Sequence, residues 1–238
     1  MRILITGAGR GLGLEMARAC IARGHSVGAT VRDRATAHDL GELAAHHRGR
    51  VVLCDLDIAQ SDRIDSAVAG VAAELGGLDI VINNAGVNAM SLPGARGTLS
   101  LQTLTAEPML EMFRINSVAP ILVARAALPW LRQAENPRIV NISSWIGAIT
   151  TTTYSGNYAY AASKAALNMA SRVMANELRD DGVTVVALNP GWVRTSMGGT
   201  RAELAPEDAA AGIVSVAEGL VPAQSGRFLQ WDGTEHAW

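Results

Sequence analysis

Short, continuous apolar runs alternate with stretches of helical periodicity along almost the whole chain. Runs of Val, Ile and Leu without polar alternation are typical of strands buried on both faces of a sheet. Because strands and helices take turns, we expect parallel strands joined by right-handed crossovers. The sequence therefore predicts an α/β fold, a doubly wound parallel sheet of seven strands with helices on both faces. The expected strands are 3–6, 26–31, 51–53, 78–82, 138–142, 183–188 and 227–230, and the expected helices are 12–23, 61–75, 105–133, 158–179 and 206–218.

Size and charge narrow the class of protein. A length of 238 residues suits one large core, so we expect a single domain over 1–238. The net charge of −2 gives no bulk attraction to nucleic acid or to an anionic membrane surface. No apolar run reaches the roughly 18 residues of a membrane span, and a signal peptide is not expected. Cys20 and Cys54 stand among apolar neighbours and are interpreted as buried thiols in a reducing, cytoplasmic compartment.

A glycine-rich string, Thr6–Gly13, joins the first expected strand to the first expected helix. Glycine permits a tight turn, a close approach of the backbone to a pyrophosphate, and close packing of the helix on the sheet. The amides at the helix N-terminus then point at the anion. The string therefore predicts a dinucleotide-binding turn, although a turn without a ligand remains the alternative. The expected contacts are Gly7, Gly9, Arg10, Gly11, Leu12 and Gly13.

Three motifs together resemble one known family. The glycine spacing of Thr6–Gly13, the tetrapeptide Asn83-Asn84-Ala85-Gly86 and the pair Tyr160-x-x-x-Lys164 resemble the hallmarks of the short-chain dehydrogenase/reductase family. The resemblance covers nearly the whole chain, and its closing segment is most similar to the C-factor and sniffer-like carbonyl reductase branch. It implies a Rossmann fold that binds NAD(P).

Tyr160 and Lys164 are four residues apart and therefore share one face of the expected helix. Hydride reduction of a ketone leaves an alkoxide that needs a proton, and a phenol beside an ammonium and a positive nicotinamide can exchange that proton. The resemblance makes Tyr160 the general acid/base and Lys164 a ligand of the nicotinamide ribose. It gives Ser144 the polarisation of the carbonyl oxygen, with Ser143 as the alternative, and Asn116 a place in a water relay.

The second expected strand ends at Arg32-Asp33. An arginine there pairs with the 2′-phosphate of NADP, whereas an acidic residue binds the ribose hydroxyl of NAD. Arg10 adds a second cation, so the sequence favours NADP over NAD. Further cofactor contacts are implied by the resemblance alone: Asp55, Leu56, Asn83, Ala85, Gly86, Pro190, Gly191, Val193 and Thr195.

The expected function is an NADP(H)-dependent oxidoreductase, a carbonyl reductase or alcohol dehydrogenase that acts on a small carbonyl compound or secondary alcohol. The alternative is a dinucleotide-binding signalling protein of the C-factor type. Helices 105–133 and 158–179 suggest, by the same resemblance, a homo-oligomer, dimer or tetramer. The histidines show no metal-ligand spacing, so no metal is expected. A mobile lid is expected to begin at Met197-Gly198-Gly199.

Overall fold

The computed structural model describes residues 1–238 and contains one sheet of seven parallel strands in the order β3-β2-β1-β4-β5-β6-β7. The chain starts in the middle of the sheet, builds outward to β3, and then crosses back to build from β4 to β7. This reversal makes the sheet doubly wound, as the sequence predicted. The strands are β1 Arg2–Ile5, β2 Ser26–Val31, β3 Val51–Asp55, β4 Ile80–Asn83, β5 Arg138–Ile142, β6 Thr184–Asn189 and β7 Phe228–Gln230.

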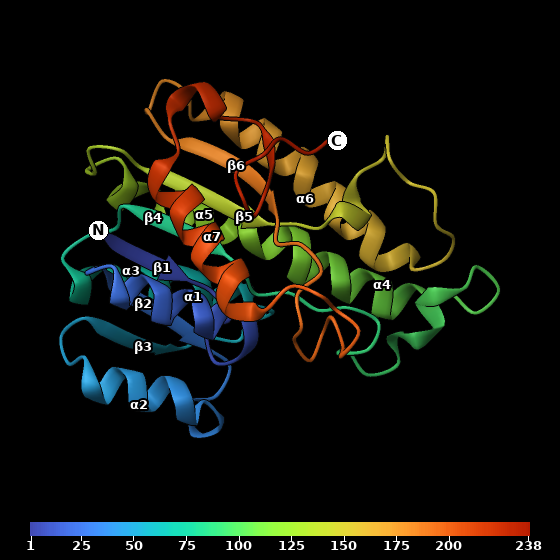
Figure 1. Ribbon diagram of the computed structural model, residues 1–238, viewed down its shortest axis with the longest axis horizontal. Helices are drawn as coiled ribbons and strands as arrows, with labels where there is room; N and C mark the ends of the chain where they lie inside the picture. Colours follow the sequence, from blue (N-terminus) through green and yellow to red (C-terminus); the bar gives the residue numbers. More distant parts are fainter.

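Helices cover both faces of the sheet (Figure 1). One face carries α1 (Gly11–Ala22), α2 (His38–His46) and α7 (Pro206–Gly219), and α1 packs on α7. The other face carries α3 (Ile64–Leu75), α5 (Ala119–Leu131) and α6 (Tyr158–Glu177). Helix α4 (Ala106–Phe113) extends beyond the sheet and packs on α6.

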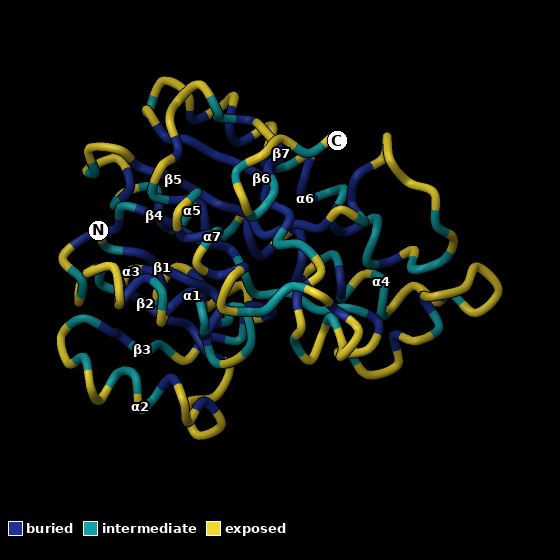
Figure 2. The backbone as a smooth tube through the Cα atoms, viewed as in Figure 1, coloured by how far each residue is buried: buried dark blue, intermediate teal, exposed yellow.

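Two apolar clusters, one between each face of the sheet and its helices, hold the layers together. Figure 2 shows the strands as the most continuously buried part of the chain. All residues of β4, β5 and β6 are buried, which explains why their sequences lack polar alternation. The approach of helix to sheet is close at Gly28 of β2, where an added Cβ would lie 2.1 Å from Val71 Cγ1.

Two helical predictions need correction. The expected helix 105–133 is three segments, because a π-helical stretch, Arg114–Val118, separates α4 from α5. Helix α2 was not predicted at all, since it presents only one buried residue, Leu40, and so lacks the apolar stripe that reveals a helix.

The segments that follow β4, β5 and β6 lie at the carboxyl end of the sheet (Figure 1). Residues 87–104 contain a 3-10 turn, Ala95–Leu99, with Ala95 and Thr98 fully buried. The backbone N–H of Asn157 donates to the carbonyl of Leu99, which joins this region to the segment before α6. None of the helices combines the length and the apolar character that crossing a membrane requires.

Candidate active site

The Thr6–Gly13 turn packs against the turn that follows β4. Gly7 has a φ of +68°, and an added Cβ would lie 2.9 Å from the Cα of Ala85. At Gly13 an added Cβ would lie 2.3 Å from the carbonyl oxygen of Gly7. The side chain of Asn84 donates to the carbonyls of Thr6 and Gly7, at 2.9 and 3.1 Å. The glycines are therefore required by close backbone contacts at both positions.

Helix α1 begins without a cap. Its N-cap residue, Arg10, is extended and makes no capping hydrogen bond, and its first turn contains no acidic residue. The first amides of the helix therefore need an anion or water as acceptor, which fits the pyrophosphate of a dinucleotide. An added Cβ at Gly11 would lie 3.6 Å from Thr195 Cγ2, so the segment after β6 also reaches this turn, as the predicted cofactor contact of Thr195 requires.

The charged side chains after β2 differ in whether they have hydrogen-bond partners. Arg32 is exposed and makes no ion pair or hydrogen bond. The carboxylate of Asp33 instead accepts a hydrogen bond from Ala35 N–H at 2.8 Å and caps a 3-10 turn. Arg34, which the sequence reasoning missed, donates to both oxygens of Asp55, from its backbone N–H at 3.0 Å and from Nε at 2.8 Å. Arg32 is thus free to meet a phosphate, while both acidic side chains are already engaged.

The predicted contacts after β3 and β4 differ in their surroundings. Leu56 is 2% exposed and its side chain lies in the core. Asn83 is also buried, and its Nδ2 donates to Asn141 Oδ1 at 2.8 Å, which joins β4 to β5. The Oδ1 of Asn83 has no partner. Ala85 and Gly86 lie between the glycine turn and α6, since an added Cβ at Gly86 would lie 3.7 Å from Lys164 Nζ.

Tyr160, Lys164 and Ser144 come together at the carboxyl end of β5. Lys164 Nζ lies 5.8 Å from the centre of the Tyr160 ring and donates to the carbonyl of Ile142 at 2.8 Å. The Ser144 hydroxyl lies close enough to the Tyr160 hydroxyl to lower the pKa of the phenol. Because Ile142 ends β5 and Ser144 follows two residues later, strand β5 brings the three polar groups to one place.

Burial shifts the pKa of both ionisable groups against their charged forms. It raises the pKa of Tyr160 to about 12, an effect that the Ser144 hydroxyl opposes. It lowers the pKa of Lys164 from 10.5 to about 8. Without a nicotinamide, the phenol is therefore protonated at neutral pH. This is the form that donates a proton. Burial thus raises the pKa of Tyr160, although a neighbouring ammonium on its own would lower it.

The two serines after β5 point in different directions. Ser143 is 2% exposed, and its hydroxyl donates to Asn168 Oδ1 at 2.5 Å, inside the protein. Ser144 faces Tyr160. The geometry therefore favours Ser144 over the alternative, Ser143. Asn168 was missed by the sequence reasoning, although its position four residues after Lys164 places it on the same face of α6.

Asn116 is fully buried within the π-helical stretch. Its Oδ1 accepts from Val87 N–H at 2.9 Å, and its Nδ2 donates to the Val87 carbonyl and to Ser163 Oγ, at 2.9 and 3.0 Å. The side chain thus joins the π-helical stretch to the β4 loop and to α6. A role of its backbone in a water relay stays a prediction. The π-helical register is a common device at functional sites.

Aromatic side chains lie on the segments that follow β5 and β6. Trp145 and Tyr154 pack edge to face at 5.7 Å, and the Tyr154 hydroxyl donates to the Ile146 carbonyl. Tyr154 is therefore engaged and does not compete with Tyr160. Trp192 Nε1 donates to the carbonyl of Gly198 at 2.9 Å, and Asn88 Nδ2 donates to the carbonyl of Met197 at 3.5 Å, so the predicted lid segment is held by more than one hydrogen bond.

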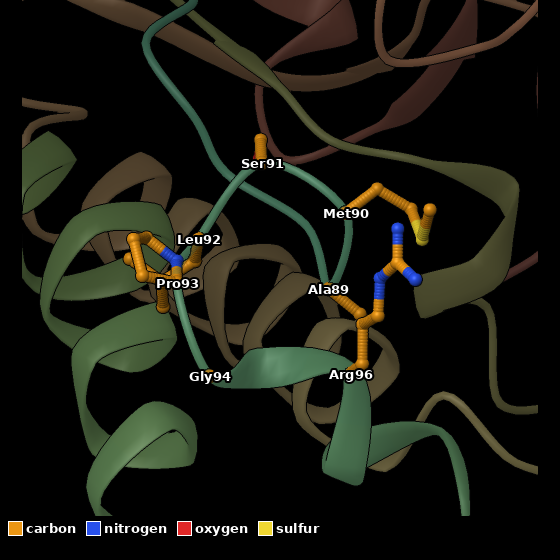
Figure 3. A pocket seen from close by; sticks show the side chains of 7 residues that line it. All are labelled: Ala89, Met90, Ser91, Leu92, Pro93, Gly94 and Arg96. Atoms are coloured by element: carbon orange, nitrogen blue, oxygen red, sulfur yellow. The ribbon is translucent and has the colours of Figure 1, made fainter.

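A further cavity lies between residues 89–94 and Arg96 (Figure 3), with a volume of about 340 Å³. Figure 3 shows the guanidinium of Arg96 beside the thioether of Met90. Ala89 and Ala95 pack with Ala159 and Tyr160 in a small apolar cluster, so this cavity wall is continuous with the start of α6.

Comparisons with known proteins agree with this geometry. A family model described as short chain dehydrogenase matches residues 1–205. The carbonyl reductase Sniffer of D. melanogaster superposes with a TM-score of 0.92 at 33% identity, covering 100% of this chain and 99% of that one. The NADPH-bound carbonyl reductase from chicken fatty liver superposes with a TM-score of 0.91 at 34% identity, covering 100% and 98%.

A signalling relative is also present. The C-signal of Myxococcus xanthus is 42% identical over 163 residues, which cover 68% of this chain and 94% of that protein. Both branches named by the sequence resemblance are thus found among the similar proteins. The family model extends over most of the sheet, the glycine turn and the tyrosine-lysine pair. The chain therefore belongs to the short-chain dehydrogenase family.

Proposed function

We propose that this chain is an NADP(H)-dependent carbonyl reductase or alcohol dehydrogenase, a single domain that acts on small carbonyl compounds or secondary alcohols. The observation that carries the proposal is the meeting of Tyr160, Ser144 and Lys164 at the strand ends, beside the uncapped N-terminus of α1. The similarity to carbonyl reductases of known structure supports the same reaction class.

The residues divide the chemistry among them. A bound nicotinamide supplies or accepts the hydride. Ser144 donates a hydrogen bond to the substrate oxygen, where negative charge develops. Tyr160, with a pKa of about 12 in the free chain, holds a proton at neutral pH and gives it to that oxygen during reduction. Lys164 contributes positive charge near the ring and, released from Ile142, reaches the nicotinamide ribose.

Three features support NADP rather than NAD. Arg32 is unpaired, Arg10 lies at the start of α1, and the Asp33 carboxylate is engaged by Ala35 N–H. A 2′-phosphate near Arg32 therefore meets positive charge without a competing carboxylate. One of the similar structures is described as NADPH-bound. Asp55, Leu56, Asn83, Ala85, Gly86, Pro190, Gly191, Val193 and Thr195 complete the proposed cofactor site, with Gly7, Gly9, Gly11, Leu12 and Gly13.

The experiment that tests the proposal compares the wild type with Tyr160→Phe on a panel of aldehydes, ketones and secondary alcohols, with NADPH and NADH. We expect turnover in the wild type and a loss of roughly 100-fold or more in the variant, the usual contribution of a positioned acid or base. NADPH affinity should be retained. Full activity of Tyr160→Phe, or no turnover of any compound by the wild type, would contradict the proposal.

Lys164 is the only lysine in the chain, which allows a second test that does not require a substrate. If Lys164 binds the nicotinamide ribose, NADPH should slow modification of this lysine by an amine-directed reagent. The Arg32→Ala variant provides a matched control, because it should need more NADPH for the same protection. Equal labelling of Lys164 with and without NADPH would count against the cofactor site.

Two partner assignments belong to the proposal. The outer faces of α5 and α6 expose Ile121, Met169 and Val173, at 40, 66 and 53%, which suits a helix-to-helix homo-oligomer, dimer or tetramer. Light scattering of the wild type and of Met169→Glu tests this. A cytoplasmic location is consistent with two free cysteines, Cys20 buried and Cys54 half-buried rather than fully buried as predicted.

The similarity to C-signal favours one second candidate, a signalling protein that binds a dinucleotide and turns over little or nothing. The presence of Tyr160 and Lys164 argues against it, because binding alone does not need the phenol. The two functions separate in cells that carry Tyr160→Phe. Retention of every cellular role without turnover would establish the signalling function.

A further inference from the structure

The turn that carries Ser144 is held by a side chain to which the mechanism gives no role. The backbone N–H of Trp145, the residue after Ser144, donates to Asn189 Oδ1 at 3.0 Å. Asn189 is 4% exposed and ends strand β6. Its Nδ2 donates to Gln230 Oε1 at 2.6 Å, on the neighbouring strand β7. The oxygen of the Asn189 amide therefore binds the serine turn, and its nitrogen binds Gln230.

The position of the Ser144 hydroxyl depends on the shape of this turn. Ser144 Oγ accepts a hydrogen bond from Ile146 N–H at 3.2 Å, within the turn itself. That bond takes one lone pair and leaves the hydroxyl proton for Tyr160 or a substrate. Because Trp145 lies between Ser144 and Ile146, a movement of its backbone N–H moves both ends of this hydrogen bond.

The opposite side of the turn is attached to α6. Asn168 accepts from the Ser143 hydroxyl and donates to the Gly147 carbonyl at 3.3 Å. An added Cβ at Gly147 would lie 2.8 Å from Lys164 Cβ, so the turn rests directly on the helix that carries Tyr160. Asn189 thus attaches the turn to the sheet through a side chain, in addition to the backbone hydrogen bond from Ser143 N–H to the Leu188 carbonyl, and Asn168 attaches it to α6.

We propose that Asn189, braced by Gln230, is a positioning residue that sets the place of the Ser144 hydroxyl relative to Tyr160. The inference rests on the proposed function, because it assigns Ser144 a part in turnover. It goes further because it assigns a positioning role to a residue other than Tyr160, Lys164 and Ser144.

The hydrogen-bond pattern predicts which substitution is tolerated. Asn189→Leu keeps a similar volume but leaves the Trp145 N–H without its acceptor. Asn189→Asp keeps that acceptor, and Gln230 can rotate its amide to donate to the second carboxylate oxygen. Gln230→Leu leaves the hydrogen bond from Trp145 to Asn189 in place and removes only the one from Asn189 Nδ2 to Gln230. We expect the effects to rank Asn189→Leu, then Gln230→Leu, then Asn189→Asp.

The experiment is a double-mutant cycle with Ser144→Ala, followed by kcat, the KM for a carbonyl substrate, NADPH affinity and Tm. Removal of a donor to a developing oxyanion costs on the order of 100-fold in kcat, so Ser144→Ala should fall by about that factor. Asn189→Leu should lower kcat about tenfold with NADPH affinity unchanged. In the Ser144→Ala background it should cause less than about a twofold further loss, because the positioned group is gone. Ile213→Ala, a core substitution in α7, serves as the control for a lowered Tm.

Each outcome has a distinct meaning. If Ser144→Ala retains full kcat, the proposed function of Ser144 fails. If Ser144→Ala loses activity and Asn189→Leu does not, only the positioning role is overturned. Equal losses from Asn189→Leu in both backgrounds, or a loss of NADPH affinity that matches the loss in kcat, would also overturn it. Recovery of kcat in Asn189→Asp supports it, even if its Tm is lower.

Discussion

Replacing Lys164 with methionine tests how strongly burial acts on the one lysine of the chain. The folded pKa of about 8 lies below the 10.5 of the exposed group. Between these values the unfolded chain binds a proton that the folded protein does not. The free energy of unfolding of the wild type therefore rises with pH in this window. From pH 7 to pH 10 the gain is about 2.5 kcal/mol, at 1.36 kcal/mol per pKa unit.

The variant lacks this titration, so the difference in unfolding free energy between the two proteins should change by the same amount in favour of the wild type. The lost hydrogen bond from Nζ to Ile142 shifts the variant by a constant and does not alter the trend. Urea unfolding at pH 7, 8, 9 and 10 measures the difference. NMR of lysine labelled at Cε gives one side-chain signal and reads the pKa directly. Parallel stability profiles, with an NMR midpoint near 10.5, would refute the argument.

Three other substitutions test separate parts of the structure. Arg32→Ala should raise the KM for NADPH about tenfold and leave that for NADH nearly unchanged, which steady-state kinetics with both cofactors measures. Gly13→Ala places a methyl group 2.3 Å from the Gly7 carbonyl oxygen, so we expect about 1–3 kcal/mol of destabilisation by urea titration and weaker NADPH binding. Burial alone would raise the pKa of Asp79, but hydrogen bonds from Arg2 lower it. Asp79→Asn should therefore lower the free energy of unfolding by about 1 kcal/mol at neutral pH. This difference between the variant and the wild type should disappear as the pH falls through the lowered pKa of Asp79. A difference that persists in acid would contradict the pairing.

The central strands β4, β5 and β6 were predictable because they are buried on both faces. Prediction and structure agree in both bounds for Ser26–Val31 and Arg138–Ile142. Helix α2 escaped detection because its single buried residue, Leu40, gives no periodicity. The break at Arg114–Val118 was also invisible, since the apolar pattern continues through the π-helical stretch, and only the buried Asn116 signals a departure from ordinary helix.

The site residues were predictable where they are close in sequence, and were not predictable where the contact joins residues that are distant in sequence. Tyr160 and Lys164 lie one helical turn apart, and the glycines of the first turn are close together in the sequence. The choice between Ser143 and Ser144, however, depends on Asn168, whose side chain occupies the inner position. Asn189 and Gln230 are 41 residues apart, and neither has a local pattern that predicts their contact. Partners of this kind follow from the strand order, which only the folded sheet supplies.

The pKa values of the two central groups also bear on the direction of the reaction. In the free chain, burial keeps Tyr160 as a phenol and weakens the hold of Lys164 on its proton. A phenol that is protonated throughout the neutral range is ready to donate to an alkoxide, whereas abstraction of a proton from an alcohol first requires its ionisation. The ammonium 5.8 Å from the Tyr160 ring favours that ionisation only while it is itself charged, which is at or below about pH 8. Burial therefore acts on both groups in the same sense, because it raises the pKa of the phenol and also makes the ammonium that could assist its ionisation easier to deprotonate.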